Sequence, residues 1–305
     1  MTGFVDLQVN GYAGIDFNAD DYSDESVHDV CERLRSDGTD SILATVITAP
    51  LDRMVARVSR IASLIDAYPQ VRERIGGIHV EGPFLNPAEG YIGAHPTADS
   101  MPANTDVVNR LLDAGCGHVR LWTLAPEMDD DGRATSYLTK RGVVVAAGHC
   151  DATLDQLRVS IDNGLKLFTH LGNGCPGSLP RHDNIVQRVL SLSDRLMISF
   201  IADGHHVPPF ALRNYLQLVP SENVVIVTDA ISAAGLGPGK YELSGQSVEV
   251  DEDGAAWAAC RTHFAGCATT FPQMVDVLKQ RVGVTDEQIE SWMKRNPARL
   301  LKTVG

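Results

Sequence analysis

The fold is decided by residues 75–83, whose sequence is IGGIHVEGP. An apolar run leads to a carboxylate, Glu81, and the Gly-Pro pair directly after it ends the predicted strand. A polar side chain at the last position of a buried strand lies at the mouth of the structure that the strand helps to build. Taken alone, Glu81 is better explained by a cap or an ion pair at a strand end than by a functional role.

The same pattern, an apolar run that ends in a polar residue, recurs along the chain. Strands are predicted at residues 4–11, 41–48, 75–81, 118–124, 143–149, 166–170, 196–202 and 224–229. Helical periodicity separates them, over residues 24–36, 51–68, 105–114, 131–141, 154–163, 185–192 and 209–218. Eight short apolar strands that alternate with helices predict an α/β fold, a (β/α)8 TIM-like barrel.

The rest of the chain adds small elements to this barrel. Residues 241–259 predict a C-terminal hairpin with its turn at 251–254, and helices are expected over 269–281 and 286–294. No composition shift or linker divides the sequence, so we expect a single domain over residues 1–305.

Composition narrows the possible partners. The chain of 305 residues carries 26 Lys plus Arg against 39 Asp plus Glu, a net charge of −13, which argues against nucleic acid and anionic membranes as partners. No apolar run approaches the ~20 residues that cross a bilayer. The six cysteines are scattered without Cys-x-x-Cys spacing, which is typical of reduced thiols, so we expect a cytoplasmic protein.

Polar residues gather at the predicted carboxyl ends of the strands, where barrels of this kind place their active sites. His149, His170 and His206 fall at or just beyond such ends, and His95 lies in an adjoining loop. Each histidine alone is best explained as structural, but the convergent set indicates a site. His79 lies two residues before Glu81 on the same face of its strand, and it could be a second-shell residue or a core residue.

The chemistry of this set is coherent. Glu81, His149 and His170 supply one oxygen and two nitrogen ligands, which suits a catalytic zinc with one open position. A bound divalent ion lowers the pKa of a water and polarises a carbonyl. Asp229, at the end of the last strand, can take a proton from the water and return it to a leaving amine. The residues therefore predict metal-assisted hydrolysis of a C–N bond.

Nine stretches of the sequence resemble one known family in order and spacing. They are residues 6–11 (DLQVNG), 79–87 (HVEGPFLNP), 93–95 (GAH), 124–127 (LAPE), 148–149 (GH), 169–171 (THL, with an Asn at 173), 203–207 (DGHHV), 227–230 (VTDA) and 296–299 (NPAR). The family is that of the N-acetylglucosamine-6-phosphate deacetylases, in the metal-dependent amidohydrolase superfamily. The resemblance implies a barrel of the amidohydrolase type, a small-molecule substrate, and release of acetate from N-acetylglucosamine 6-phosphate to leave glucosamine 6-phosphate.

The resemblance also assigns roles to individual residues. Glu81, His149 and His170 would hold one divalent metal per subunit, expected to be zinc. Gln8 and Asn10 stand where many amidohydrolases have two histidines that hold a second metal, so they are candidates for the second shell. Asp229 would be the catalytic acid and base, and His95 would orient or polarise the acetyl carbonyl. The sugar-phosphate contacts would be His206, Asn173 and the backbone of Gly174. Arg181 would contact the phosphate, and in known members this arginine comes from the neighbouring subunit of a homodimer.

The sequence departs from the family pattern where the substrate is chosen and where subunits meet. The small β-sandwich that both chain ends usually form is not expected here, and residues 174–175, 182–184 and 267 differ from the family. Two alternatives therefore stay open. One is a related amidohydrolase that acts on another N-acyl sugar, an N-acyl amino acid or a cyclic amide. The other is a non-catalytic barrel that binds a sugar phosphate.

Overall fold

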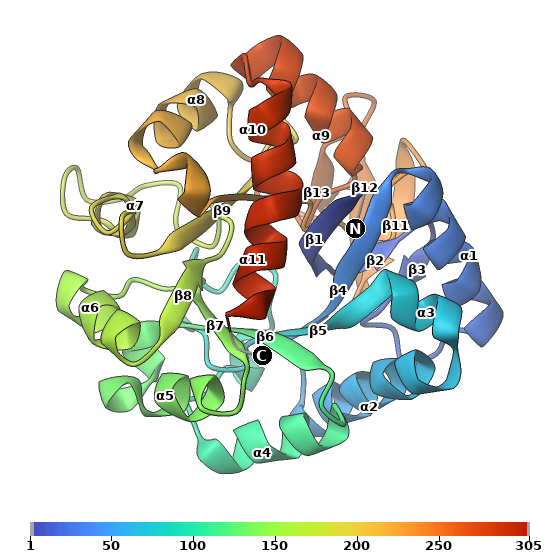
Figure 1. The fold of residues 1–305 in the computed structure, drawn as a ribbon, viewed down its shortest axis with the longest axis horizontal. Coiled ribbons are helices and arrows are strands. Elements are labelled where there is room, and N and C mark those ends of the chain that lie inside the picture. The colour runs from blue at the N-terminus through green and yellow to red at the C-terminus, as the bar shows by residue number, and fades with distance from the viewer. Residues whose placement is uncertain (1–2, 304–305) are drawn as a thin grey trace.

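The computed structural model describes residues 3–303, and a parallel sheet of eight strands forms its centre (Figure 1). The first and last strands of the sheet approach each other through a parallel bridge between Val9 and Ala230, so the sheet nearly closes into the expected barrel. In sheet order the strands are β1 (Phe4–Val9), β4 (Thr39–Ile47), β5 (Ile75–Glu81), β6 (Val119–Leu124), β7 (Val144–Ala147), β8 (Leu165–Phe168), β9 (Met197–Ile201) and β10 (Val224–Val227).

Helices surround the sheet and cover its outer face (Figure 1). They are α1 (Asp24–Ser36), α2 (Leu51–Ala67), α3 (Pro69–Arg74), α4 (Thr105–Ala114), α5 (Arg133–Thr139), α6 (Leu154–Asp162), α7 (Ile185–Leu190) and α8 (Pro209–Leu218). Strands and helices alternate as the sequence predicts. No helix within residues 3–303 combines the length and the apolar character that crossing a membrane requires.

Local sequence explains where these helices begin and which face they bury. The Ser23 hydroxyl accepts a hydrogen bond from the backbone amide of Ser26 and so caps α1. In α6, Thr153 and Gln156 form a reciprocal capping box. The buried residues of α1 (Val27, Val30, Cys31 and Leu34) recur at helical spacing and pack on the sheet.

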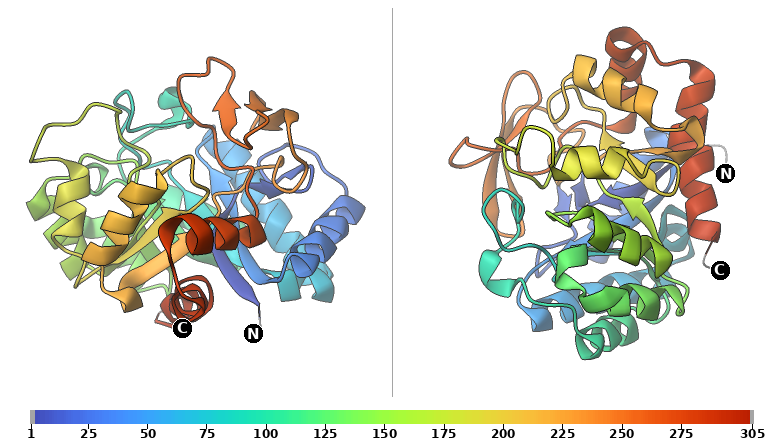
Figure 2. Two further views of the ribbon diagram at one scale, coloured as in Figure 1. Left: turned by 90° about the horizontal axis from the view of Figure 1, so that it is seen from above. Right: turned by 90° about the vertical axis from the view of Figure 1, so that its left-hand side faces the viewer.

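The C-terminal helices close the amino-terminal end of the barrel (Figure 2). α10 (Asp286–Glu290) continues through a π-helical turn into α11 (Asn296–Lys302), and α9 (Phe271–Val277) precedes them. The side-chain amide of Asn296 donates hydrogen bonds to the carbonyl of Val224, at the start of β10, and to that of Ser221. The two expected C-terminal helices are therefore present, over residues 271–282 and 286–302, and the second continues beyond its predicted end at 294 to Lys302.

A small antiparallel sheet lies at the opposite end, beyond the carboxyl ends of the barrel strands (Figure 2). It consists of β11 (Gly239–Leu243), β12 (Gln246–Val250) and β13 (Ala256–Ala258), and the short pair β2 (Gly11–Tyr12) and β3 (Ile15–Asp16) lies after β1. The predicted hairpin is therefore a three-strand meander: its first turn is Ser244-Gly245, with both residues at positive φ, and its second is the predicted turn at 251–254. Residues 3–303 contain no β-sandwich built from both chain ends.

The interior of the barrel below its mouth is polar. The ring of His79 lies between the hydroxyls of Thr45 and Thr123, at 3.4 and 2.8 Å, and is fully buried. The Thr169 hydroxyl donates a hydrogen bond to Gln8 Oε1 at 2.7 Å. Each of these groups has a partner, so the layer is a hydrogen-bonded platform beneath the mouth.

Candidate active site

A cavity of about 860 Å³ opens at the carboxyl ends of the strands. Nine of the twelve residues that the sequence assigns to the site line this cavity, and Gln8, His79 and Arg181 do not. The nine are Asn10, Glu81, His95, His149, His170, Asn173, Gly174, His206 and Asp229.

Three of these residues adopt the left-handed backbone conformation, which is unfavourable for residues other than glycine. His149, His170 and Asp229 have φ angles of 51°, 35° and 52°, and each follows within two residues of the end of its strand. A non-glycine residue held there costs roughly 1–3 kcal/mol, and such strain is typical of functional sites. The backbone is therefore turned at these three points so that the side chains enter the cavity.

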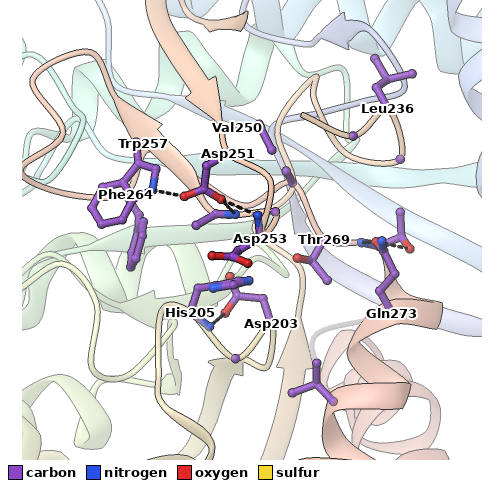
Figure 3. Close-up of a pocket in the computed structure, with 18 of the residues that line it drawn as sticks. Asp203, His205, Leu236, Val250, Asp251, Asp253, Trp257, Phe264, Thr269 and Gln273 are labelled. Carbon is purple, nitrogen blue, oxygen red and sulfur yellow. Dashed lines mark hydrogen bonds between the residues drawn. The ribbon is translucent and has the colours of Figure 1, made fainter. Parts of the chain in front are cut away.

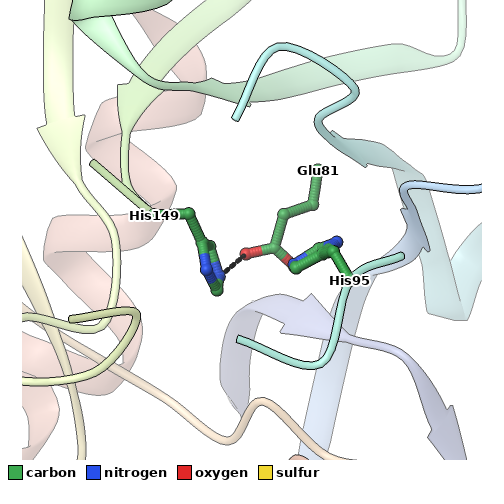
Figure 4. A group of neighbouring side chains, drawn as sticks. All are labelled: Glu81, His95 and His149. Carbon is green, nitrogen blue, oxygen red and sulfur yellow. Dashed lines mark ion pairs between the residues drawn. The ribbon is translucent and has the colours of Figure 1, made fainter. Parts of the chain in front are cut away.

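Glu81 lies between two imidazoles. Its Oε1 atom is 3.3 Å from Nε2 of His149 and 3.2 Å from Nε2 of His170, and all three side chains are buried (Figure 4 shows Glu81 with His149). Two ligands of one tetrahedral zinc, each about 2.0–2.1 Å from the ion, are about 3.3 Å apart. The spacing of these three atoms is thus that of ligands around one small cation.

The hydrogen bonds of His149 support the same conclusion. Its Nδ1 lies 2.8 Å from the carbonyl oxygen of Tyr91, which can only accept, so Nδ1 carries the proton and a neutral ring has its lone pair on Nε2. That lone pair faces the oxygen of Glu81, an arrangement that requires a proton or a cation between the two atoms. Although burial alone would raise it, the histidines hold the pKa of Glu81 well below its usual range.

His95 is a second candidate for the third ligand, because Glu81, His95 and His149 have donor atoms within 4.8 Å of one another (Figure 4). The backbone amide of Thr48 donates to Nδ1 of His95 at 3.3 Å, so Nε2 of the neutral ring carries the hydrogen. Burial, with the nearby His149, lowers the pKa of His95 to about 3, so the ring is neutral near pH 7. His95 is therefore arranged as a hydrogen-bond donor, and His170 suits the role of ligand better.

Asp229 lies on the wall of the same cavity and is oriented by Asn10. The side-chain amide of Asn10 donates to Asp229 Oδ1 at 2.7 Å. Burial, followed by the negative charge of Glu81, raises the pKa of Asp229 to about 6. A carboxyl whose pKa lies near neutrality can both take and return a proton.

The three candidates for the second shell differ in their contacts. Gln8 donates to Glu81 Oε1 at 3.0 Å, and Asn10 contacts Asp229. His79 makes its hydrogen bonds in the layer of threonines below, and burial lowers its pKa to about 4. Gln8 and Asn10 thus lie where second-shell residues would, whereas His79 is a core residue.

Of the predicted substrate contacts, all but Arg181 line the cavity. Asn173 and Gly174 line the cavity, and a Cβ atom on Gly174 would lie 2.9 Å from Nδ1 of His149, so only glycine fits there. Arg181 is exposed and outside the cavity wall. Within residues 3–303, no arginine or lysine lines this cavity.

β13 and the loop after it also reach the cavity, which the sequence did not indicate. The residues from this segment that line the wall are Trp257, Thr262, His263 and Phe264. These residues lie in or after a short strand outside the barrel, so reasoning from the ends of the barrel strands could not find them. Their aromatic content was the only available signal.

Glu127 joins the two loops that carry the metal-ligand candidates. Its Oε1 accepts hydrogen bonds from the side chain of Asn86, at 2.8 Å, and from the backbone amide of Asp151, at 2.6 Å. The backbone amide of Asn86 in turn donates a hydrogen bond to the backbone carbonyl of His149. Glu127 therefore fixes the loop after Glu81 against the loop after His149.

We expect Glu127→Ala to lower the free energy of unfolding by about 1–3 kcal/mol, because both donors lose their acceptor in a partly buried place. Glu127→Gln keeps an oxygen that can accept both bonds and should stay close to wild type. Urea unfolding of the two variants checks this difference. An alanine variant as stable as the glutamine variant would contradict the bracing role.

Comparisons with known proteins point to one group. An N-acetylglucosamine-6-phosphate deacetylase of Lysinibacillus sphaericus is 30% identical over 302 residues, which are 99% of this chain and 76% of the relative. An N-acetylgalactosamine-6-phosphate deacetylase of Escherichia coli O157:H7 is 30% identical over 99% of this chain and 78% of its own length. No family model matches the chain.

Solved structures agree with the sequence relatives. The N-acetyl-D-glucosamine-6-phosphate deacetylase of Mycobacterium smegmatis, solved as a mutant in complex with N-acetyl-D-glucosamine-6-phosphate, superimposes with a TM-score of 0.88 at 32% identity. The match covers 99% of this chain and 77% of that one. The barrel, its open end and the order of its strands are thus shared with this structure.

Proposed function

The chain belongs to the N-acetylglucosamine-6-phosphate deacetylase family, and on that premise we propose that it hydrolyses the acetamide bond of N-acetylglucosamine 6-phosphate to acetate and glucosamine 6-phosphate. One observation carries the proposal most strongly. A carboxylate, two imidazoles, a third imidazole that is a donor and a proton-accepting carboxyl all face one cavity. A barrel that only bound a sugar phosphate would not need this set.

We propose that Glu81, His149 and His170 hold one divalent ion per subunit, and that the ion is zinc. The oxygen and nitrogen donors and their spacing of 3.2–3.3 Å support this assignment. When bound, the ion supplies Lewis acidity, which polarises the acetyl carbonyl and lowers the pKa of a water. Gln8 keeps the Glu81 carboxylate in place through its hydrogen bond to Oε1.

The protein's own groups move the protons and hold the developing charge. Asp229 takes a proton from the attacking water and then delivers it to the departing amine nitrogen, while Asn10 fixes the orientation of the carboxyl. The Nε2–H group of His95 donates a hydrogen bond to the acetyl oxygen and gains strength as negative charge develops there.

This role of Asp229 predicts an acid limb in the pH profile. Asp229 must be ionised to take the proton, so kcat/KM should fall tenfold per pH unit below the pKa of this carboxyl. That pKa is about 6, and a bound cation favours the ionised form and moves the limb to lower pH. Initial rates between pH 4 and 9 test this, and a midpoint of the acid limb clearly above pH 6 would exclude Asp229 as its source.

A second substrate is favoured by a specific finding. The relative of Escherichia coli that acts on N-acetylgalactosamine 6-phosphate is as similar to this chain as the first relative described above. Release of acetate from the two phosphorylated epimers and from unphosphorylated N-acetylglucosamine separates the possibilities. Turnover of one phosphorylated epimer alone fixes the substrate, and turnover of none of the three sugars overturns the proposed function.

We further propose a cytoplasmic homodimer in which Arg181 reaches the phosphate in the neighbouring subunit. Its exposed position outside the wall of its own cavity supports this arrangement. The six free cysteines are consistent with a reducing compartment. Sedimentation of the purified protein tests the dimer, and a monomer at assay concentration would exclude an arginine supplied by a partner.

A further inference from the structure

A buried carboxylate that the mechanism does not use lies directly behind His206. Oδ2 of Asp203 is 2.6 Å from Nδ1 of His206, and the side chains of Asp203 and His206 are 3% and 7% exposed. Oδ1 of Asp203 accepts from the backbone amides of His205 and His206, each at 2.9 Å. The carboxylate therefore fixes both the loop and the ring of His206.

Two further contacts restrict this pair. The thiol of Cys267 lies 3.5 Å from Oδ2 of Asp203 and can donate to it, while the ring of Phe264 packs on that of His206 with centroids 4.9 Å apart. Donor atoms of Asp203, His206 and Cys267 lie within 4.8 Å of one another. The 2.6 Å between Asp203 and His206 is nevertheless a hydrogen bond, because two zinc ligands would be about 3.3 Å apart.

Asp203 and His206 line different cavities. Asp203 lines a second cavity, of about 1150 Å³, whose wall also includes His205, Asp251 and Gln273 (Figure 3). His206 lines the active-site cavity instead, and Asp203 does not. Asp203 thus acts through His206 and not on the substrate.

The carboxyl of Asp203 is ionised and lies against the ring of His206. Although burial alone would raise it, His206 and the two backbone amides hold the pKa of Asp203 below its usual range, so this carboxyl is anionic. A buried carboxylate at Nδ1 keeps the hydrogen on that atom and holds the ring in one orientation. No lysine or arginine between residues 3 and 303 lines the active-site cavity, so any side-chain contact to a phosphate from this subunit has to use another donor, such as histidine.

We propose that Asp203 is the positioning residue that holds the ring of His206 in place as a contact for the phosphate of the substrate. This inference rests on the proposed function and adds to it the source of the preference for phosphorylated sugars. Two other titratable groups lie near His206: Asp229, whose side chain lines the same cavity, and Cys267, a thiol next to Asp203 whose pKa is raised by burial. Neither can replace Asp203, since only Asp203 contacts Nδ1.

The variant Asp203→Asn tests the inference. Its amide would place a donor against the Nδ1–H group of His206 and would remove the charge, so we expect KM for the phosphorylated sugar to rise 10- to 100-fold with a smaller change in kcat. The ratio of kcat/KM for the phosphorylated and unphosphorylated sugars should fall by a similar factor. Asp162→Asn is the matched control, an exposed carboxylate paired with Arg195, and should keep the wild-type ratio.

A double-mutant cycle separates positioning from simple damage to the fold. If Asp203 acts through His206, the losses of Asp203→Asn and His206→Asn should not add when combined. Full additivity, or an unchanged ratio in Asp203→Asn, overturns the inference while leaving the deacetylase function intact.

If the wild type hydrolyses neither sugar, the proposed function fails and the inference is decided by binding of inorganic phosphate. Calorimetry should then show weaker binding to Asp203→Asn than to the wild type and to Asp162→Asn. Equal binding by all three proteins would overturn the inference as well.

Discussion

Asp229→Asn is expected to lower kcat by about 10²- to 10⁴-fold while the zinc content of the purified protein stays unchanged. The amide has the shape of the carboxyl and keeps an oxygen that can accept the hydrogen bond from Asn10. It cannot take a proton from water, so the proton-transfer steps lose their catalyst. The fall should appear in kcat and in kcat/KM alike, because the lost interaction belongs to the transition state.

Metal analysis beside the kinetics decides what the loss means. Asp229 does not belong to the proposed ligand set of Glu81, His149 and His170, so the number of zinc ions per chain should stay at the wild-type value. A variant that loses zinc and turnover together would identify Asp229 as a ligand instead. A variant that keeps both its zinc and its turnover would show that Asp229 is not the catalytic acid and base.

His149→Ala is expected to lower zinc content well below one per chain and kcat/KM by about 10³-fold or more. The substitution removes Nε2, which lies 3.3 Å from Glu81, and leaves that buried carboxylate with fewer partners. Loss of a Lewis acid is worth several kcal/mol in the transition state, and each 1.36 kcal/mol is tenfold in rate.

The matched control is His118→Ala. His118 also contacts a carboxylate, that of Asp66 at 2.9 Å, but it lies just before β6, at the amino-terminal end of the barrel. Its removal should leave zinc content and turnover unchanged. Equal zinc content in the two variants would contradict the assignment of His149 as a ligand.

The sequence predicts the barrel and the position of its site because both depend on short-range patterns. Apolar runs that end in Glu81, His170 or Asp229 can be recognised without the structure, and all three side chains line the cavity. The helix boundaries of α1, α4 and α8 also agree with the predicted ones, since caps and periodicity are local signals.

The contacts that orient the site could not be predicted in this way. The proton position on His149 depends on the carbonyl of Tyr91, and that on His95 depends on the amide of Thr48. Backbone groups carry no sequence signal for such long-range pairs. The left-handed turns at the ends of the strands likewise follow from tertiary packing and not from local propensity.

The arrangement of the substrate side differs most from expectation. Arg181 has no place in the wall of its own cavity, whereas Trp257 and Phe264 have one. Both come from the segment after the barrel, where the sequence predicts only a hairpin. The wall of the cavity is therefore built in part by elements outside the eight repeating units.

A zinc titration of metal-free protein tests the central claim most directly. Acetate release from N-acetylglucosamine 6-phosphate should be absent without metal, rise in proportion to added zinc, and reach its plateau at one equivalent per chain. Turnover that persists in the stripped protein, or a plateau only at two equivalents, would contradict a single hydrolytic metal held by Glu81, His149 and His170.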